Sequence, residues 1–370
     1  MIRRLLLLNG LAIVGVVLNH TIGWGYVAMF WWTDRYRPVA VPDFSQMGGL
    51  SYWGLRFFEQ LLMFSIPAFL FVSGYFIAVA TGRTRSNVSP SVVRQRIVNL
   101  AIPYLLWSLI YFGANAVLED QIFTPWQYLR LLLVGGAAQA FYYVPLVIQL
   151  YLLALLMVPL ARSHWRPLLL ASLAIQLVPL ALRYPVLLGM DWPWAIQLER
   201  WFPAWFFPGH LFWFTVGVVV GFHVGDFRVW LARWKWWLLG LLVVTVPLGI
   251  LEWEWILRAS SQGWLGQERT FFDDLYSALA ILTFLAFERV NLPAARQLAD
   301  WGTRSYGIYL VHSLVLLVAM KVIYHAVPWL LAHQILLQPL LLALGLAVPL
   351  ALMALVNRSP ARRFYAYLFG

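Results

Sequence analysis

The stretch LLLLNGLAIVGVVLNHTIGW at residues 5–24 decides the class of fold. It contains no Asp, Glu, Lys or Arg, and as an α-helix it is long enough to cross the ~30 Å hydrocarbon core of a bilayer. It follows Arg3 and Arg4 directly, as in a signal peptide, but it runs too long and lacks a small-residue cleavage site before Trp24. We therefore expect a permanent membrane-spanning helix.

Similar apolar runs recur along the whole chain and predict an all-α polytopic membrane protein. Because the runs are continuous rather than alternating, they favour helices over barrel strands. A shorter apolar stretch at 125–138 is expected at the membrane interface, and residues 1–370 are expected to form one transmembrane domain. We predict about ten spanning helices, at residues 5–24, 55–80, 97–118, 141–161, 166–183, 205–223, 236–252, 271–288, 304–326 and 330–356.

The composition supports this class and excludes others. Hydrophobic residues make up 62% of the chain and charged residues only 11%, against roughly 25% in soluble domains. The net charge of +11 could suggest nucleic-acid binding, but the basic residues alternate along the chain instead of forming one patch, so we expect no nucleic-acid partner. The absence of cysteine excludes disulfides, cysteine-bound metals and a cysteine nucleophile.

The loops predict that both chain ends face the cytoplasm. Lys and Arg collect on the cytoplasmic side of membrane proteins. With the N-terminus inside, most of the 26 basic residues fall in inside segments. Those segments carry Arg3, Arg4, Arg83, Arg85, Arg94, Arg96, Arg162, Arg166, Arg228, Arg233, Lys235, Arg289, Arg296, Arg304, Arg358, Arg362 and Arg363. The asymmetry favours an even number of helices.

Two ionisable residues within the apolar runs are candidate catalytic groups. His20 lies late in the first helix, and Glu59 lies early in the second, so both are expected at similar depth in the outer part of the bilayer. A buried ionisable group is costly in a membrane and is a functional candidate. His20 would act as a general base oriented by Glu59. The alternatives are an interfacial histidine and a carboxylate paired with Arg56, three residues earlier.

A second set of candidates lies near the predicted inner face. Ser305, Tyr309 and His312 fall on one helical stripe. Ser73 ends the second helix beside Gly74, and small residues of this kind also permit close helix packing.

Arg94 and Arg96 precede the third helix near the same predicted face. Arginine side chains fit phosphate oxygens, so they could hold an anionic, phosphate-bearing donor, or they could serve topology alone. His210, Gln149 and Tyr151 are weaker candidates.

Four blocks in order resemble acyltransferase family 3, a family of integral membrane proteins. The first block runs from Gly10 to His20 and is similar to the family's first helix, which ends in its key histidine. The second, IPAFLFVSGYFI at 66–77, is like the family's apolar run ending in SGF or SGY. The third is RIVNLAIPYLLWS at 96–108, and the fourth is SYGIYLVH at 305–312, close to the family's late helix. The resemblance covers nearly the whole chain.

The resemblance implies an O-acyltransferase. Acyl-CoA in the cytoplasm would be the donor, with an acetyl or succinyl group expected, and no metal is expected. The acceptor would be a hydroxyl of an extracytoplasmic saccharide or glycolipid, and the protein would contact membrane lipid in a bacterial inner membrane. Arg94, Arg96, Ser73, Tyr309 and His312 would bind the donor. We expect no hydrolase-like domain after the last helix, so the chain resembles the stand-alone form of the family.

One position departs from the family pattern of arginine, ten residues, histidine. Counting back from His20, the arginine position is occupied by Asn9. Arg4 is a poor replacement, because sixteen residues turn it ~160° away from the face of His20. This departure leaves two alternatives open: a scaffold of the same fold that has lost its chemistry, and a transporter or flippase in which His20 and Glu59 relay protons.

Overall fold

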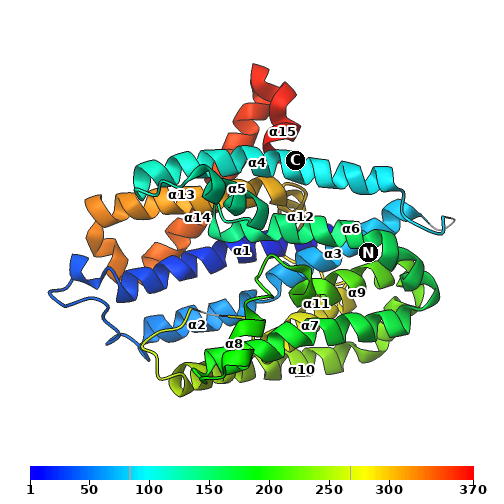
Figure 1. The fold of residues 1–370 in the computed structure, drawn as a ribbon, viewed down its shortest axis with the longest axis horizontal. Coiled ribbons are helices and arrows are strands. Elements are labelled where there is room, and N and C mark those ends of the chain that lie inside the picture. Colours follow the sequence, from blue (N-terminus) through cyan, green and yellow to red (C-terminus); the bar gives the residue numbers. More distant parts are fainter. Residues whose placement is uncertain (83–84, 267) are drawn as a thin grey trace.

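The computed structural model describes residues 1–82, 85–266 and 268–370, and these residues form helices and no strand. Arg83, counted above with the inside segments, lies outside them. The long helices run roughly along one direction (Figure 1). The α-helices are α1 (Ile2–Phe30), α2 (Leu50–Leu62), α3 (Ser65–Thr81), α4 (Pro90–Leu118), α5 (Pro125–Val134), α6 (Tyr143–Ser163), α7 (Trp165–Leu187), α8 (Pro193–Glu199), α9 (Leu211–Phe222), α10 (Val224–Ala259), α11 (Phe271–Ala286), α12 (Ala295–Thr303), α13 (Ser305–Ala326), α14 (Gln334–Arg358) and α15 (Tyr365–Phe369).

The predicted all-α polytopic fold is confirmed. In the part of the chain that the structure describes, eight spans are long and apolar enough to cross a membrane, with α2 and α3 together counting as one. The two other expected segments, 205–223 and 271–288, form the shorter helices α9 and α11. Every expected segment is thus helical, and the interfacial stretch at 125–138 contains the short helix α5.

Several helices extend well beyond the predicted apolar segments. α10 begins at Val224 rather than at residue 236, and α4 begins at Pro90 rather than at 97. Hydropathy detects only the part of a helix inside the hydrocarbon, whereas backbone hydrogen bonding continues into the polar ends. α4 starts where the side chain of Ser89 accepts a hydrogen bond from Ser91 and Pro90 occupies the first helical position.

The second predicted helix is broken where a single helix over 55–80 was expected. α2 ends at Leu62 and α3 begins at Ser65. Pro67 accounts for the break, because it has no N–H to donate to the carbonyl of Met63 and its ring would collide with that carbonyl in a continuous helix. This break contributes to the site described below.

Glycines set the closest helix pairs. A Cβ added at Gly74 of α3 would lie 2.1 Å from the backbone oxygen of Phe214 in α9, and one at Gly217 of α9 would meet α3 equally closely. Gly10 of α1 and Gly302 of α12 bring those two helices together in the same way. Small residues let helix backbones approach in membranes, so the packing explanation for Gly74 is supported.

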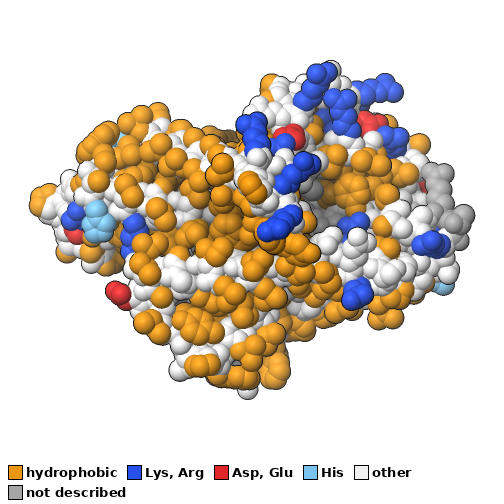
Figure 2. All heavy atoms as spheres, turned by 90° about the horizontal axis from the view of Figure 1, so that it is seen from above, with side chains coloured by type: hydrophobic (Ala, Val, Ile, Leu, Met, Phe, Trp, Pro, Cys, Tyr) orange, Lys and Arg blue, Asp and Glu red, His pale blue; other side chains and the backbone are white. Residues whose placement is uncertain are grey.

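The surface separates an apolar body from a basic end. Figure 2 shows hydrophobic side chains over most of one face and most of the visible Lys and Arg side chains over one half of it. Loops that the sequence assigned to the inside meet in space, since Arg162 contacts Gly82 and Arg228 lies 3.1 Å from Glu288. Pairs of predicted inside loops thus lie together; that they face the cytoplasm, and that the number of crossings is even, stay predictions.

Candidate active site

His20 lies in the C-terminal half of α1, facing two cavities. At 1.5 Å per residue it is ~27 Å from Ile2 and ~15 Å from Phe30 along the helix. One cavity has a volume of about 420 Å³ and the other about 940 Å³, and His20 lines both. Asn19, Gln139 and Glu268 also line both cavities, so these side chains mark the place where the cavities meet.

His312 of α13 stands beside His20. The centroids of the two imidazole rings are 5.1 Å apart, with the planes tilted by 49°. Nδ1 of His312 lies 2.8 Å from the backbone oxygen of Tyr309, so it carries the hydrogen and donates it. Nε2 is 3.1 Å from the hydroxyl of Ser313 and can accept from it. These bonds fix the ring that His20 contacts.

The break between α2 and α3 supplies one wall of the smaller cavity. Leu62, Met63, Ser65, Ile66 and Pro67 all line it. Ser65 lies against α1, where a Cβ on Gly15 would be 2.3 Å from its hydroxyl oxygen. The helix-breaking effect of Pro67 thus opens space next to His20, and a continuous helix would fill it.

Glu59 pairs with Arg56 rather than with His20 in the described contacts. Its carboxylate lies 2.7 Å from Arg56 and 3.0 Å from the hydroxyl of Tyr26, which donates to it. Arg56 also lies 3.4 Å from Glu254 on α10. Glu59 lines the larger cavity together with His20. In place of the expected bond from Glu59 to His20, the structure has the alternative, the ion pair of Glu59 with Arg56 three residues earlier.

The residues expected to bind the donor fall into two groups. Tyr309 lines the smaller cavity with His20, and its hydroxyl donates to the backbone oxygen of Ala140. His312 contacts His20 directly. The helix stripe that the sequence assigned to an inner pocket therefore reaches the His20 site, since α13 crosses α1 there.

Arg94, Arg96 and Ser73 make up the second group. Arg96 donates to the backbone oxygen of Phe76 at 3.3 Å and its guanidinium lies 5.8 Å from the ring centroid of Tyr151. Arg94 is exposed and Ser73 is half-buried. The residues that line the two His20 cavities do not include these three side chains. Arg94 and Arg96 lie in the first turns of α4, near the end of α3, whereas Ser73 lies in the middle of α3.

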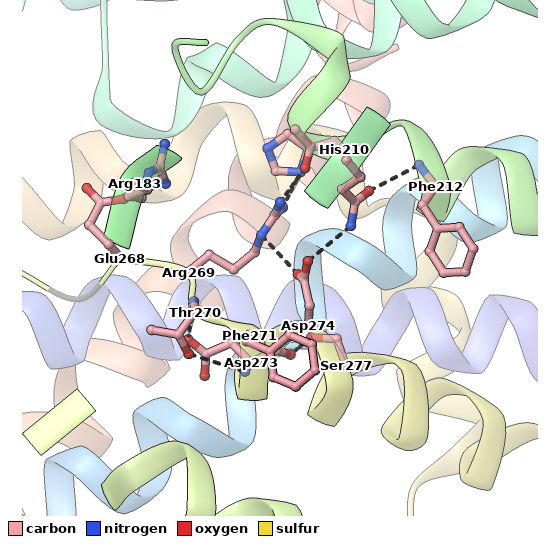
Figure 3. A network of polar contacts seen from close by, with 12 residues as sticks. Arg183, His210, Phe212, Glu268, Arg269, Thr270, Phe271, Asp273, Asp274 and Ser277 are labelled. Atoms are coloured by element: carbon pink, nitrogen blue, oxygen red, sulfur yellow. Dashed lines mark hydrogen bonds and ion pairs between the residues drawn. The ribbon is translucent and has the colours of Figure 1, made fainter. Parts of the chain in front are cut away.

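A polar network lines part of the smaller cavity (Figure 3), and the sequence pointed only to His210 among its members. Arg269 donates to Nδ1 of His210 at 2.8 Å and pairs with Asp274 at 2.9 Å. Arg183 pairs with Glu268 at 2.9 Å. In the sequence, Arg183 and Arg269 are merely loop residues of the predicted outside, and only the fold brings them to one cavity.

Comparison with known proteins decides the family. The family model described as an acyltransferase domain, Acyl_transf_3, matches residues 3–356. The chain belongs to this acyltransferase family. No curated protein and no solved structure matches it. Membership makes the chain a membrane-embedded protein of an acyltransferase family, and the predicted resemblance is confirmed.

Asn9 of α1 is the position that departs from the family pattern of arginine, ten residues, histidine. The Oδ1 atom of Asn9 is buried and has no hydrogen-bond partner among the described residues. An asparagine here can present an amide but no charge. The position that would hold an arginine therefore lacks the cation that an anionic donor would meet.

Arg4 does not fill that role. Its guanidinium donates to the backbone oxygens of Phe284, Phe287 and Val290 at 3.0–3.1 Å and lies 3.9 Å from the ring centroid of Phe284. Phe284 and Phe287 lie at the C-terminal end of α11, where helix carbonyls lack partners within the helix, and Val290 lies in the loop that follows. Arg4 is thus a cap for a neighbouring helix, in agreement with its predicted orientation away from the face of His20.

Proposed function

We propose that this protein is an O-acyltransferase that moves an acetyl or succinyl group from cytoplasmic acyl-CoA to a hydroxyl of an extracytoplasmic saccharide or glycolipid. The observation that carries the proposal is the place of His20, where two cavities meet beside His312, in a chain of an acyltransferase family. Two substrates must meet at one base, and two converging cavities provide for that. The membrane is a bacterial plasma membrane in this proposal.

His20 acts as general base in this reaction. Its neutral imidazole takes the proton of the acceptor hydroxyl while the oxygen attacks the carbonyl carbon of the thioester. The carbon–sulfur bond then breaks, the acyl group stays on the acceptor oxygen as an ester, and the proton passes to the leaving CoA sulfur. His312, with Nδ1 bonded to the backbone of Tyr309, holds the ring of His20 in position. Asn19 and Gln139 offer amide donors for the oxyanion that develops.

A series of rings supports a route for the acyl group along α13. The ring centroids of Tyr306 and Tyr309 are 6.0 Å apart, those of Tyr309 and His312 6.2 Å, and His20 follows 5.1 Å further. Tyr306 lies near the end of α13 where Arg304 stands. The donor docks near Arg94 and Arg96 in this proposal, and its acyl group reaches His20 beside these rings.

The proposal is tested with the purified protein in proteoliposomes. Radiolabelled acetyl-CoA and succinyl-CoA are supplied on one side, and neutral oligosaccharides are supplied on the other. We expect labelled, alkali-labile saccharide from the wild type and none from His20→Ala. Label that never leaves CoA with any acceptor would overturn the activity and favour the scaffold, in line with Asn9. Transport of an unmodified saccharide without acyl transfer would favour the flippase.

A further inference from the structure

The side chains that line the larger cavity beside His20 are of the types that bind carbohydrates. Its volume is about 940 Å³, and its polar lining consists of amides, hydroxyls and carboxylates next to broad aromatic faces. The aromatic side chains include three tryptophans, and indole rings stack on the C–H faces of sugars while amides and carboxylates bond their hydroxyls. These aromatic, amide and carboxylate side chains include Trp24, Trp31, Trp264, Asn115, Gln121 and Glu119.

The charged side chains that line this cavity are acidic. Among the described residues that line it there is no Lys or Arg. Two of the glutamates that line it pair with arginines that each serve two carboxylates, whereas Arg269 of the adjoining cavity pairs with Asp274. Arg56 lies 2.7 Å from Glu59 and 3.4 Å from Glu254.

The second arginine, Arg183, repeats this arrangement. It lies 2.9 Å from Glu268 and 3.7 Å from Glu199. The third lining carboxylate, Glu119, is balanced by Lys321 at 2.9 Å. Because Arg56 and Arg183 each have one carboxylate in excess, we expect a negative potential in the cavity, which would repel a carboxylate or phosphate on the ligand.

We infer that the larger cavity is the acceptor site and that it selects an uncharged saccharide over an acidic one. The inference rests on the proposed function, because a sugar in this cavity is an acceptor only if His20, at the edge of the cavity, receives its hydroxyl proton. The smaller cavity, with Tyr309 and the break before α3 in its wall, is then left for the acyl group of the donor.

Ligand binding without any donor tests the inference. The full-length protein is placed in lipid nanodiscs, and calorimetry measures a panel of neutral gluco-, galacto- and manno-oligosaccharides against uronic-acid oligosaccharides of equal length. We expect at least one neutral class to bind, and every acidic counterpart to bind at least about tenfold more weakly. Equal or tighter binding of the acidic sugars overturns the inference, and so does a panel in which no neutral sugar binds.

Matched variants locate the binding in this cavity. Trp31 and Trp53 are both 39% exposed, but only Trp31 lines the larger cavity. Trp31→Ala should weaken neutral-sugar binding by about 3- to 10-fold, the equivalent of one ring contact, and Trp53→Ala should leave it unchanged. Equal effects of the two substitutions would place the sugar elsewhere.

A charge variant tests the selectivity separately. Glu268→Gln removes one of the two carboxylates beside Arg183 and should tighten binding of the acidic sugars, whereas Glu288→Gln, paired with Arg228 at the opposite end, should not. No gain with Glu268→Gln would contradict the role of the acidic wall. Neutral-sugar binding without acyl transfer by the wild type would refute the proposed activity and leave the cavity assignment standing.

Discussion

The imidazole rings of His20 on α1 and His312 on α13 lie with their centroids 5.1 Å apart. The two residues come from opposite ends of the chain, and each was a separate candidate in the sequence. Their contact joins what we had expected to be an outer base and an inner donor pocket into one site. It also gives His20 a rigid neighbour, because the Nδ1 atom of His312 is bonded to the backbone of Tyr309.

Replacing His20 tests the base directly. His20→Ala should lower the rate of acyl transfer by about 10²- to 10⁴-fold, the usual contribution of proton transfer, with little change in thermal stability. His20→Gln keeps much of the volume and hydrogen bonding but cannot take a proton at neutral pH, so it should be equally inactive. Single-turnover rates and thermal unfolding in detergent measure both effects. An active His20→Gln enzyme would rule out the base.

Replacing His312 should affect the chemical step more than substrate binding. His312→Ala removes the ring that packs against His20, and a misplaced base lowers kcat by about 10- to 100-fold with little change in KM for the donor. His312→Asn keeps a donor near the position of Nδ1 and should recover part of kcat. Steady-state kinetics of the two variants are compared. A rise in KM at constant kcat would instead assign His312 to donor binding, as the sequence suggested.

The donor site is tested at Arg94 and Arg96. The double alanine variant should weaken acyl-CoA binding, because each charge-assisted phosphate contact is worth about 1.5–3 kcal/mol. Calorimetry with a non-hydrolysable acyl-CoA analogue measures the loss. Arg233→Ala is the matched control, since Arg233 is also exposed and is also predicted to face the cytoplasm. If both variants bind as the wild type does, Arg94 and Arg96 serve topology only.

Glu59 should matter for stability rather than for proton transfer. Glu59→Gln leaves Arg56 with Glu254 as its remaining carboxylate partner, and weakening such a buried pair should cost about 1–3 kcal/mol. Thermal unfolding should shift downward, while the folded fraction keeps its transfer rate per molecule. A large loss of rate without a loss of stability would restore the predicted orienting role.

The orientation in the membrane is tested with reporter fusions. The excess of basic residues in one set of loops predicts that these loops and both termini are cytoplasmic. Alkaline phosphatase is active only outside and fluorescent protein only inside, so paired fusions report each loop. Fusions after Arg85, Arg166, Arg233 and Arg363 should be cytoplasmic, and fusions near Asp43, Asp191 and Gln262 should be outside. A C-terminus that reports outside would contradict the even number of crossings.

The sequence by itself determined that the chain is a membrane helical bundle of this acyltransferase family. Apolar runs and the distribution of arginine follow from the free energy of transferring side chains into lipid, a local property that each segment carries. The same reasoning identified His20 and rejected Arg4 as a replacement at Asn9, because helical periodicity fixes the direction of a side chain within one helix. It also named both possible roles of Glu59 without deciding between them.

Only the tertiary structure decided which helices meet. The contact of His312 with His20 and the convergence of Arg183 and Arg269 on one cavity depend on contacts between helices far apart in the chain. In lipid such contacts are driven by close packing and by interhelical hydrogen bonds, not by a hydrophobic stripe that a sequence would display. The glycines at positions 74 and 217 show the reason: they place two backbones in contact, yet in sequence each is only a small residue in an apolar run.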